Sequence, residues 1–405
     1  MDPFSYLFSL EQFGIKFGLD NIAAIVDRLG RPDRAYRTIH IAGTNGKGSV
    51  TAMVDAALRA AGHRSARYTS PHLVDLSERF VIDGRPIATD ALAKVIADVR
   101  DVVETLRGDG TLEVQPTFFE VTTAVALEAF RRAMVDVAVL EVGLGGRLDA
   151  TNVVAPSVTA ITSIAFDHQL YLGSTLEDIA MEKAGIVKAH VPVVIGVLDE
   201  GPLAVIEQAA RDRGAPLVRT SADDVSALTV ALAGTHQRAN AAIALAVLRQ
   251  IDAQGIRVPD AAIAEGFAHP MWPGRLDRRR LADGREVLLD AAHNPAGAAA
   301  LASFIKDAPA PMVFAAMRDK DVDGMFRELL PAISALVVTR ARNPRSADPA
   351  SLADRARTIA PMLPIAIEPA IADALAAAWR RSPRIVVAGS IFLLGDVMRL
   401  LQLKV

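Results

Sequence analysis

The most regular feature of the sequence is an alternation of short apolar runs with longer stretches rich in Ala and Leu. Short apolar, β-branched runs predict buried strands, and the stretches between them predict helices. Strands that are apolar on both faces and alternate with helices indicate parallel sheets covered on both sides. The predicted strands are residues 38–42, 65–69, 135–142, 158–164 and 191–197, then 287–289, 312–316, 336–339 and 385–388.

One segment breaks this alternation and predicts a domain boundary. It reads His269-Pro270-Met271-Trp272-Pro273-Gly274-Arg275, and its prolines and glycine interrupt helix and strand alike. Residues 275–286, which follow, are dense in charge. A chain of 405 residues is long enough for two domains. We therefore predict an α/β protein with a first domain over residues 1–272 and a smaller second domain over 277–405.

The composition narrows the class of protein. Hydrophobic residues make up 51% and charged residues 22%, as in globular proteins. The mean hydropathy is +0.27, yet no apolar run approaches the ~18–20 residues that a membrane-spanning helix needs. The start of the sequence lacks the basic region of a signal peptide. A net charge of -3 disfavours nucleic acid as a partner. We expect a cytoplasmic protein that acts on a small molecule and binds neither membrane nor nucleic acid.

The absence of cysteine excludes several kinds of chemistry. With Cys 0, the chain can form no disulfide, no cysteine-ligated zinc or iron–sulfur site and no enzyme thioester. An enzyme of this composition that activates a carboxylate must do so by another route.

A glycine-rich turn joins the first predicted strand to a helical stretch over residues 50–61. It reads Gly43-Thr44-Asn45-Gly46-Lys47-Gly48-Ser49. In such turns backbone N–H groups converge on phosphate oxygens, the helix N-terminus adds partial positive charge, and a lysine neutralises the terminal phosphates. The spacing departs from the G-x-x-x-x-G-K-[ST] pattern, because the first glycine stands three positions before the Gly-Lys pair and a further glycine precedes the serine. We predict a nucleotide-binding loop; the alternative is a glycine-rich turn without a ligand.

Polar residues at the ends of predicted strands are candidates for a metal site. Ser70, Glu141, Asp167 and His168 all follow apolar runs, and the carboxyl ends of parallel strands meet at one edge of a sheet. Mg²⁺ usually takes one or two protein carboxylates together with substrate phosphates. Glu141 ends an apolar run, where a carboxylate is costly unless it is paired or binds a metal. Pairing with Arg147 is the structural alternative.

Two further residues have ordinary readings when taken alone. His168 by itself is more typical of a structural histidine than of a ligand. Lys183, in a helical segment over residues 177–188, is by itself typical of a solvated helix face.

Six motifs together resemble one known family. They are the loop of residues 43–49, Thr69-Ser70-Pro71-His72-Leu73, residues 141–152 (EVGLGGRLDATN), Asp167-His168, Glu182-Lys183-Ala184-Gly185-Ile186 and Asp290-Ala291-Ala292-His293-Asn294-Pro295. Their order and spacing resemble the folylpolyglutamate synthase/dihydrofolate synthase family, which belongs to the Mur-ligase group of ATP-dependent, amide-forming ligases. The resemblance extends from Phe17 to about Asp396. It implies an N-terminal P-loop-type Mur-ligase ATPase domain with a mostly parallel sheet and a smaller, Rossmann-like C-terminal domain.

The resemblance also implies roles for individual residues. The positions that match ATP contacts are Gly43, Thr44, Asn45, Gly46, Lys47, Gly48, Ser49, Asn240, Arg275 and Asp290. Those that match magnesium ligands are Ser70, Glu141, His168 and Lys183, the lysine acting as a carbamate formed with CO₂.

Substrate and catalytic positions are implied in the same way. Thr117, Phe118, Phe119 and Glu120 match a segment that lines a pterin pocket, and Phe17 is a further aromatic candidate. The two adjacent phenylalanines would point to opposite sides if the segment were extended. Lys47, Lys183 and His293 are the expected catalytic residues.

The implied reaction joins L-glutamate to dihydropteroate or to a folate by way of an acyl phosphate, with ATP as co-substrate and two magnesium ions. We expect a monomer, and residues 1–272 holding ATP under the second domain. Two alternatives remain. One is a Mur-type ligase for another carboxylate, which is disfavoured because only 42 residues precede Gly43 in this sequence. The other is a non-catalytic ATP-binding protein of the same fold.

Overall fold

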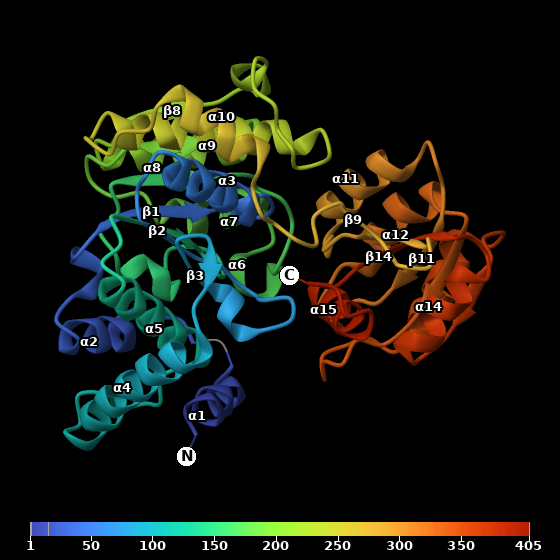
Figure 1. The fold of residues 1–405 in the computed structure, drawn as a ribbon, viewed down its shortest axis with the longest axis horizontal. Helices are drawn as coiled ribbons and strands as arrows, with labels where there is room; N and C mark the ends of the chain where they lie inside the picture. The colour runs from blue at the N-terminus through green and yellow to red at the C-terminus, as the bar shows by residue number, and fades with distance from the viewer. Residues whose placement is uncertain (1, 15, 405) are drawn as a thin grey trace.

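The computed structural model describes residues 2–14 and 16–404. They form two α/β units that lie side by side along the long axis of the molecule, each built on its own sheet (Figure 1). The first sheet contains β1 (Arg37–Ala42), β2 (Ser65–Tyr68), β3 (Phe80–Ile82), β4 (Arg85–Pro86), β5 (Val137–Glu141), β6 (Val158–Ile161), β7 (Val193–Ile195) and β8 (Leu217–Arg219). The second contains β9 (Asp277–Arg280), β10 (Glu286–Leu289), β11 (Pro311–Phe314), β12 (Ala335–Val338), β13 (Ile365–Ile367) and β14 (Arg384–Ala388).

Helices cover both faces of each sheet. Those of the first unit are α1 (Pro3–Ser9), α2 (Asp20–Arg28), α3 (Lys47–Ala60), α4 (Thr89–Gly108), α5 (Phe118–Arg132), α6 (Gln169–Leu172), α7 (Leu176–Ala184), α8 (Glu200–Asp212), α9 (His236–Asp252) and α10 (Asp260–Ala268). Those of the second are α11 (Pro295–Ile305), α12 (Val322–Leu329), α13 (Pro349–Ile359), α14 (Ile371–Trp379) and α15 (Ile391–Leu400).

Both sheets are mostly parallel. The strand order is β4-β3-β2-β5-β1-β6-β7-β8 in the first and β13-β12-β11-β14-β10-β9 in the second. Among the described residues, the antiparallel pairings are β2 with β3, β3 with β4 and β9 with β10. The central strand β1 lies between β5 and β6, so the loop that follows it emerges in the middle of the sheet edge. This is the place where open α/β sheets bind ligands.

All nine predicted strands form, and five further strands were not predicted. Four of these, β4, β8, β9 and β13, are the outermost strands of their sheets, and β3 forms a hairpin with β4. None of the four outermost strands contains a buried residue. An edge strand has a neighbour on one side only, so it needs no continuous apolar run, and its sequence lacks the signal on which the prediction rests.

The period-two alternation of side chains divides the core of the first unit. Val137 and Val139 of β5 pack with α3, α9 and α10 on one face of the sheet. Ala138 and Leu140 pack with α1, α2, α4 and α5 on the other face. Because both faces are buried, every position of β5 is apolar until Glu141, the last residue of the strand.

The second unit follows the same arrangement, with one residue contributed from outside. Alternate residues of its strands pack against α11–α13 on one face and against α14 and α15 on the other. Leu73, from the first unit, belongs to the second of these clusters and is 9% exposed. The segment after β2 is therefore fixed to the second unit by apolar packing.

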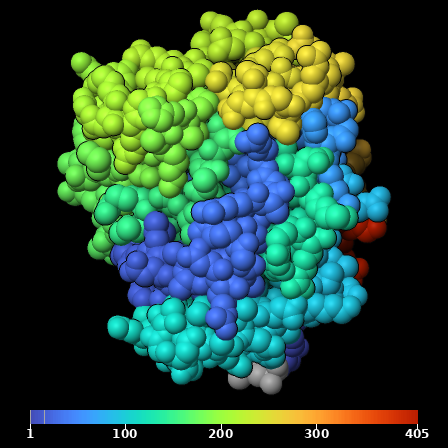
Figure 2. Space-filling model, turned by 90° about the vertical axis from the view of Figure 1, so that its left-hand side faces the viewer, coloured from blue at the N-terminus to red at the C-terminus, as the bar shows by residue number. Residues whose placement is uncertain are grey.

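The connection between the units runs from the end of α10 at Ala268 to the start of β9 at Asp277. The predicted end of the first domain, residue 272, falls within this connection, and the predicted start of the second, residue 277, falls at its end. Both domain limits stay predictions. Figure 2 looks along the long axis from the first unit, which hides almost all of the second. Among the helices of the described residues, none is long and apolar enough to cross a membrane.

His40 is a polar residue in the middle of β1. It is fully buried, and its Nε2 lies 2.8 Å from Thr151 Oγ1, which in turn donates to Asp149. Burial, with a smaller contribution from the charge of Lys188, lowers the pKa of His40 to about 3. The folded protein therefore holds this imidazole neutral.

This burial predicts an acid sensitivity of the fold. As the pH falls from about 6.5 toward 3, the unfolded chain takes up a proton at His40 that the folded chain refuses, so stability falls by at most about 1.4 kcal/mol per pH unit. We expect the Tm of the wild type, measured by thermal unfolding, to fall relative to that of His40→Gln as the pH is lowered from about 7 to about 4.5. A constant difference for His40→Gln would contradict the prediction.

Candidate active site

The glycine-rich loop between β1 and α3 packs closely against side chains of the first unit. Gly43 and Gly46 have φ of 146° and 88°, which favour glycine. A Cβ on Gly43 would lie 1.9 Å from Thr162 Oγ1, and one on Gly46 would lie 2.3 Å from Asn240 Oδ1. The predicted ATP contact Asn240 therefore supports the loop from its buried side. These close approaches require both glycines and fix the path of the loop N–H groups.

Residues 162–165, which follow β6, hydrogen-bond to the same loop. Thr44 Oγ1 donates to the carbonyl of Ala165 at 3.1 Å and accepts from its N–H at 3.0 Å. The N–H of Asn45 donates to Ser163 Oγ at 3.0 Å, and Thr162 Oγ1 donates to the carbonyl of Asn45 at 2.6 Å. The loop is thus preorganised by neighbouring strand ends, as an anion-binding turn needs to be.

Two lysine side chains meet on one carbonyl oxygen of this loop. Lys47 Nζ lies 3.1 Å from the oxygen of Gly43 and 3.2 Å from that of Thr44, and Lys183 Nζ lies 3.0 Å from the oxygen of Gly43. Lys183 is 3% exposed. Burial, and then the charge of Lys47, lower the pKa of Lys183 to about 7. The interpretation of Lys183 as a solvated surface lysine is wrong, because α7 directs it inward.

Glu141 and Ser70 lie together at the ends of the neighbouring strands β5 and β2. The N–H of Ser70 donates to Glu141 Oε2 at 3.3 Å. The alternative partner Arg147 pairs with Glu182 instead, at 2.8 Å. Burial raises the pKa of Glu141, although the charge of Lys47 opposes this. Glu141 is thus a buried carboxylate that forms no ion pair within the described residues.

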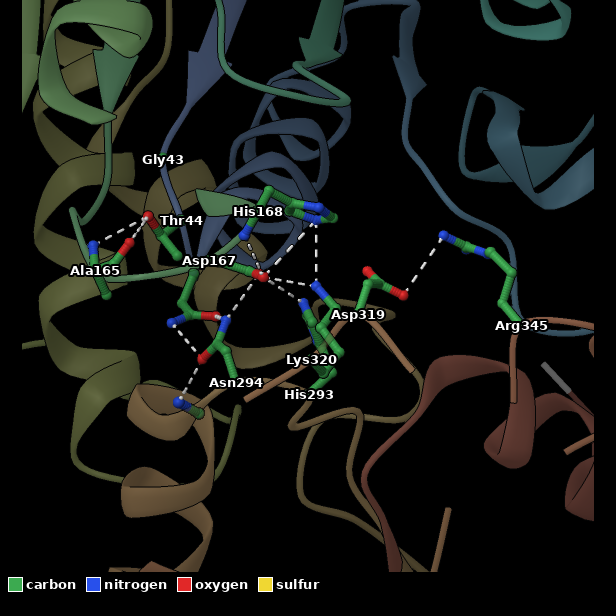
Figure 3. A network of polar contacts seen from close by, with 12 residues as sticks. Gly43, Thr44, Ala165, Asp167, His168, His293, Asn294, Asp319, Lys320 and Arg345 are labelled. Carbon is green, nitrogen blue, oxygen red and sulfur yellow. Dashed lines mark hydrogen bonds and ion pairs between the residues drawn. The ribbon is translucent and has the colours of Figure 1, made fainter. Parts of the chain in front are cut away.

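Asp167 is the centre of a network that joins the two units (Figure 3). Its carboxylate lies 2.6 Å from Lys320 Nζ and 3.3 Å from His293 Nε2, and it accepts a hydrogen bond from Asn294 Nδ2 at 3.1 Å. Burial alone would raise the pKa of Asp167, but the hydrogen bond and charge of His293, with Lys320 and His168, hold it well below its usual range. Asp167 is therefore an anion that three groups of the second unit surround.

The same network reaches the phosphate loop and His168. The amide side chains of Asn45 and Asn294 exchange hydrogen bonds of 3.2 and 3.0 Å. His168, which begins α6 with a φ of 52°, has its Nε2 3.3 Å from Lys320 Nζ. Burial, and then the charge of Lys320, lower the pKa of His168 to about 4. His168 is thus a neutral imidazole at neutral pH, as metal ligation requires.

His293 has both ring nitrogens facing oxygen. Its Nδ1 lies 2.8 Å from the carbonyl of Ala291, and its Nε2 faces Asp167. A carbonyl oxygen only accepts hydrogen bonds, so Nδ1 carries the proton. This hydrogen bond orients the ring so that Nε2 points at the carboxylate of Asp167.

Arg275 and Asp290 lie where the connection enters the second unit. Asp290 accepts from the N–H of Leu276 at 2.8 Å and from that of Ala292 at 2.9 Å. Burial lowers the pKa of the Arg275 guanidinium, while the charges of Asp290 and Glu141 oppose this. Arg275 therefore brings a cation from the connection toward the site in the first unit.

The predicted pterin segment begins a helix rather than an extended strand. Thr117 caps α5: its Oγ1 accepts from the N–H of Glu120, and the Glu120 carboxylate accepts from the N–H of Thr117 at 2.8 Å. Phe118 stacks on Phe8 with ring centroids 6.0 Å apart, and Phe119 lies 6.0 Å from Tyr68. The segment is helical rather than extended from Phe118 onward, so the alternation expected of an extended backbone does not apply, and the helix start separates the two rings.

Phe17 makes its ring contact with Tyr171 rather than with this segment. It is 46% exposed, and its ring centroid is 6.0 Å from that of Tyr171. A cleft of about 500 Å³ lies between the units, lined by residues 164–166 after β6 and by Pro295 and Ala296 at the start of α11. The structure places Phe17 outside the residues that line this cleft.

The donors present suit a magnesium–nucleotide complex better than a metal cage. In residues 2–14 and 16–404, no three His, Asp or Glu side chains group so as to hold a metal ion. Glu141, however, is a buried carboxylate that forms no ion pair among the described residues, beside Ser70 and the phosphate loop. Mg²⁺ commonly takes one or two protein carboxylates together with substrate phosphate oxygens and water. The residues therefore fit a metal that arrives with a nucleotide.

Sequence reasoning missed Lys320 and gave Asn294 no role. Lys320 follows the predicted strand 312–316, so the rule that strand ends carry site residues could have found it. Nothing in the sequence indicated that its partner is Asp167, since the two are 153 positions apart. The pairing depends on how the units dock.

Comparison with known proteins places this site in a class. Residues 274–391 match the family described as Mur ligase, glutamate ligase domain. The chain is 35% identical over 356 residues to the dihydrofolate synthase/folylpolyglutamate synthase of Bacillus subtilis, covering 81% of this chain and 82% of that one. The fold and site are thus those of a Mur-type ligase.

Two solved structures agree. Mycobacterium tuberculosis folylpolyglutamate synthase, complexed with ADP and AMPPCP, superposes with a TM-score of 0.90 at 34% identity over 100% of both chains. A bifunctional folylpolyglutamate synthase/dihydrofolate synthase with Mn, AMPPNP and L-glutamate bound superposes with a TM-score of 0.86 at 29% identity. The match covers 100% of this chain and 98% of that one. The chain belongs to the dihydrofolate synthase/folylpolyglutamate synthase family. The resemblance and fold class inferred from the sequence are confirmed.

The Asn294 bridge yields a prediction that separates docking from folding. Asn294 caps α11 by accepting from the N–H of Gly297 at 2.8 Å, and its Nδ2 joins Asn45 to Asp167. Asn294→Ser keeps a capping oxygen but loses the bridging N–H groups. We expect Asn294→Ser to keep the wild-type Tm and to lose about tenfold or more in kcat. Asn294→Ala, which also lacks the capping oxygen, should have a lower Tm as well as a lower kcat. Unchanged kcat in Asn294→Ser would refute a role for the bridge.

Proposed function

We propose that the protein joins L-glutamate to a carboxylate of dihydropteroate or of an existing folate, converting ATP to ADP and phosphate. One observation carries the proposal: the phosphate loop meets the second unit through the paired amides of Asn45 and Asn294. A nucleotide held by the loop would therefore have its terminal phosphate at the boundary between the units. Membership of the family supports the identity of the substrates.

In the first step the acceptor carboxylate oxygen bonds to the γ-phosphorus of ATP, and ADP leaves. Two anions must approach each other, so the site needs fixed positive charge. The N–H groups of the loop, the N-terminus of α3 and the Lys47 ammonium supply it. Lys47, now folded back on loop carbonyls 3.1 and 3.2 Å away, would turn to the phosphates. Asn240, Arg275 and Asp290 complete this ATP site in the proposal.

In the second step the amine nitrogen of glutamate bonds to the carbonyl carbon of the acyl phosphate. Phosphate leaves with the electrons of the C–O bond, and the nitrogen loses one proton. With Cys 0, no enzyme thioester competes with this route. His293, the expected catalytic histidine, reaches this boundary from the second unit, beside Asp167. The docked second unit also excludes water, which would hydrolyse the acyl phosphate.

Magnesium completes the proposal. Ser70, Glu141 and His168 would hold one ion, and a carbamate on Lys183 would help to hold a second. Bound Mg²⁺ supplies neutralisation of the phosphate charge. A carbamate forms when a neutral amine nitrogen bonds to CO₂ and releases a proton. Lys183 suits this, because it is buried beside the loop.

The pterin ring would lie near Phe118 and Phe119. Thr117 and Glu120 would shape the pocket through the capped start of α5, and Phe17 would lie at its rim. The charge of the Arg79 guanidinium, 5.1 Å from the Phe118 ring centroid, makes this wall suitable for an anionic acceptor. The protein would act as a cytoplasmic monomer.

The reaction itself is tested by ADP release. We expect ADP release that depends on L-glutamate, with dihydropteroate as acceptor and also with tetrahydrofolate, and a product heavier by one glutamate residue in mass spectrometry. Activity with only one acceptor would restrict the function to one of the two synthases. ATP binding without any release of ADP would favour the non-catalytic alternative, and ADP release with another acceptor would favour a different Mur-type ligase.

The carbamate is tested at Lys183. We expect Lys183→Ala and Lys183→Arg both to lose about a hundredfold or more in kcat, because neither side chain can form the carbamate that the site needs. Native mass spectrometry of the wild type should show the added mass of one CO₂, absent from both variants. A near-wild-type kcat in Lys183→Arg would contradict the proposal that Lys183 acts as a carbamate, since arginine can replace only the cationic form of lysine.

A further inference from the structure

Trp272, in the connection between the units, packs directly on the phosphate loop. A Cβ built on Gly48 would lie 2.0 Å from Cζ2 of the Trp272 indole and 2.7 Å from its Cε2. Gly48 lies in the first turn of α3, and its φ is not in the region that favours glycine. The backbone would thus accept alanine at this position. The indole alone requires the glycine.

A second contact holds the connection to the same helix. Arg67 Nη2 donates to the carbonyl of Met271 at 3.3 Å, while its Nη1 lies 3.3 Å from Asp55 of α3. The guanidinium carbon is 5.6 Å from the centroid of the Trp272 ring. Arg67 is 7% exposed. The connection is therefore clamped to α3 at two points before it leaves the first unit.

Two residues later the chain belongs to the second unit. The carbonyl of Gly274 accepts from the N–H of Ala291 at 2.9 Å, and the N–H of Leu276 donates to Asp290 at 2.8 Å. Gly274 has a φ of 72°. The chain thus passes from contacts with the first unit at Trp272, which packs on Gly48, to contacts with the second unit at Gly274.

We propose that Trp272 is a positioning residue that couples the placement of the second unit to the geometry of the phosphate loop. Its ring presses on the helix turn whose N–H groups face the nucleotide phosphates, and the chain continues from it to Arg275. A bound nucleotide fixes that turn and so fixes the start of the connection. The proposal rests on the nucleotide site of the proposed function, but not on the identity of the acceptor.

The indole serves packing rather than hydrogen bonding. Trp272 Nε1 is buried and has no hydrogen-bond partner among the described residues. A buried N–H without a partner carries a cost. Here the ring size compensates, because the indole fills the space that a glycine at position 48 leaves open.

A double-mutant cycle with ADP binding tests the contact. Gly48→Ala should weaken ADP binding by about tenfold or more, because the new methyl group displaces either the ring or the loop. In Trp272→Ala the same Gly48→Ala change should cost little, so that the double variant binds ADP like Trp272→Ala alone. Trp272→Phe should retain more affinity than Trp272→Ala. Equal costs of Gly48→Ala in both backgrounds would overturn the proposal.

Fluorescence provides a test that needs no change at Gly48. The chain has two tryptophans, and Trp379 lies at the end of α14 in the second unit with Arg285 stacked 4.0 Å from its ring centroid. In Trp379→Phe, the remaining emission of Trp272 should change on addition of ADP and magnesium. In the matched Trp272→Phe protein the emission of Trp379 should not. An ADP-insensitive Trp272 would overturn the coupling.

Kinetics separates positioning from a general loss of structure. Trp272→Ala should raise the KM for ATP and lower kcat while leaving the KM for the acceptor and the Tm near wild type, whereas Trp379→Ala should leave both constants for ATP unchanged. A parallel loss in all constants of Trp272→Ala would mean a merely structural role. If the wild type binds ADP but makes no glutamate adduct, the proposed function fails while the cycle still decides this inference.

Discussion

The buried ion pair between Asp167 and Lys320 is the interaction on which the site depends. Both side chains are 8% exposed, and they come from different units. Removing either partner by mutation would leave the other as an uncompensated buried charge, which costs about 3–5 kcal/mol. The pair therefore specifies one docking of the units more than it adds stability. That docking places His293 and Asn294 over the phosphate loop, where neither side of the site is complete alone.

Close backbone packing gives the loop its rigidity. Three of its glycines touch side chains that leave no room for a Cβ, namely Thr162, Asn240 and Trp272. The loop can therefore present its N–H groups without reorganisation, which is the property that makes fixed dipoles effective against developing charge. The same contacts tie the loop to the neighbouring strand, to α9 and to the connection between the units.

Charge in the site is concentrated and opposed, although the chain as a whole is near neutral at -3. Lys47 and Lys183 share the carbonyl of Gly43, and the buried Glu141 lies within reach of the Lys47 charge. A buried amine near another cation is more easily neutral, and a buried carboxylate without a partner attracts a cation. Both the neutral amine and the cation-binding carboxylate are consequences of burial, and the net charge of the chain does not predict either of them.

The sequence by itself determined the central strands, the loop of residues 43–49 and, through the set of motifs, the family. Apolar runs and glycine spacing are local, so they can be read without knowing the docking of distant segments. Tertiary structure alone decided that Lys183 points inward, that Glu141 is unpaired while Arg147 binds Glu182, and that Lys320 meets Asp167. Edge strands such as β9 also escaped detection. In each case the outcome depends on burial or on contact between segments far apart in the chain, and such contacts are set by packing rather than by local pattern.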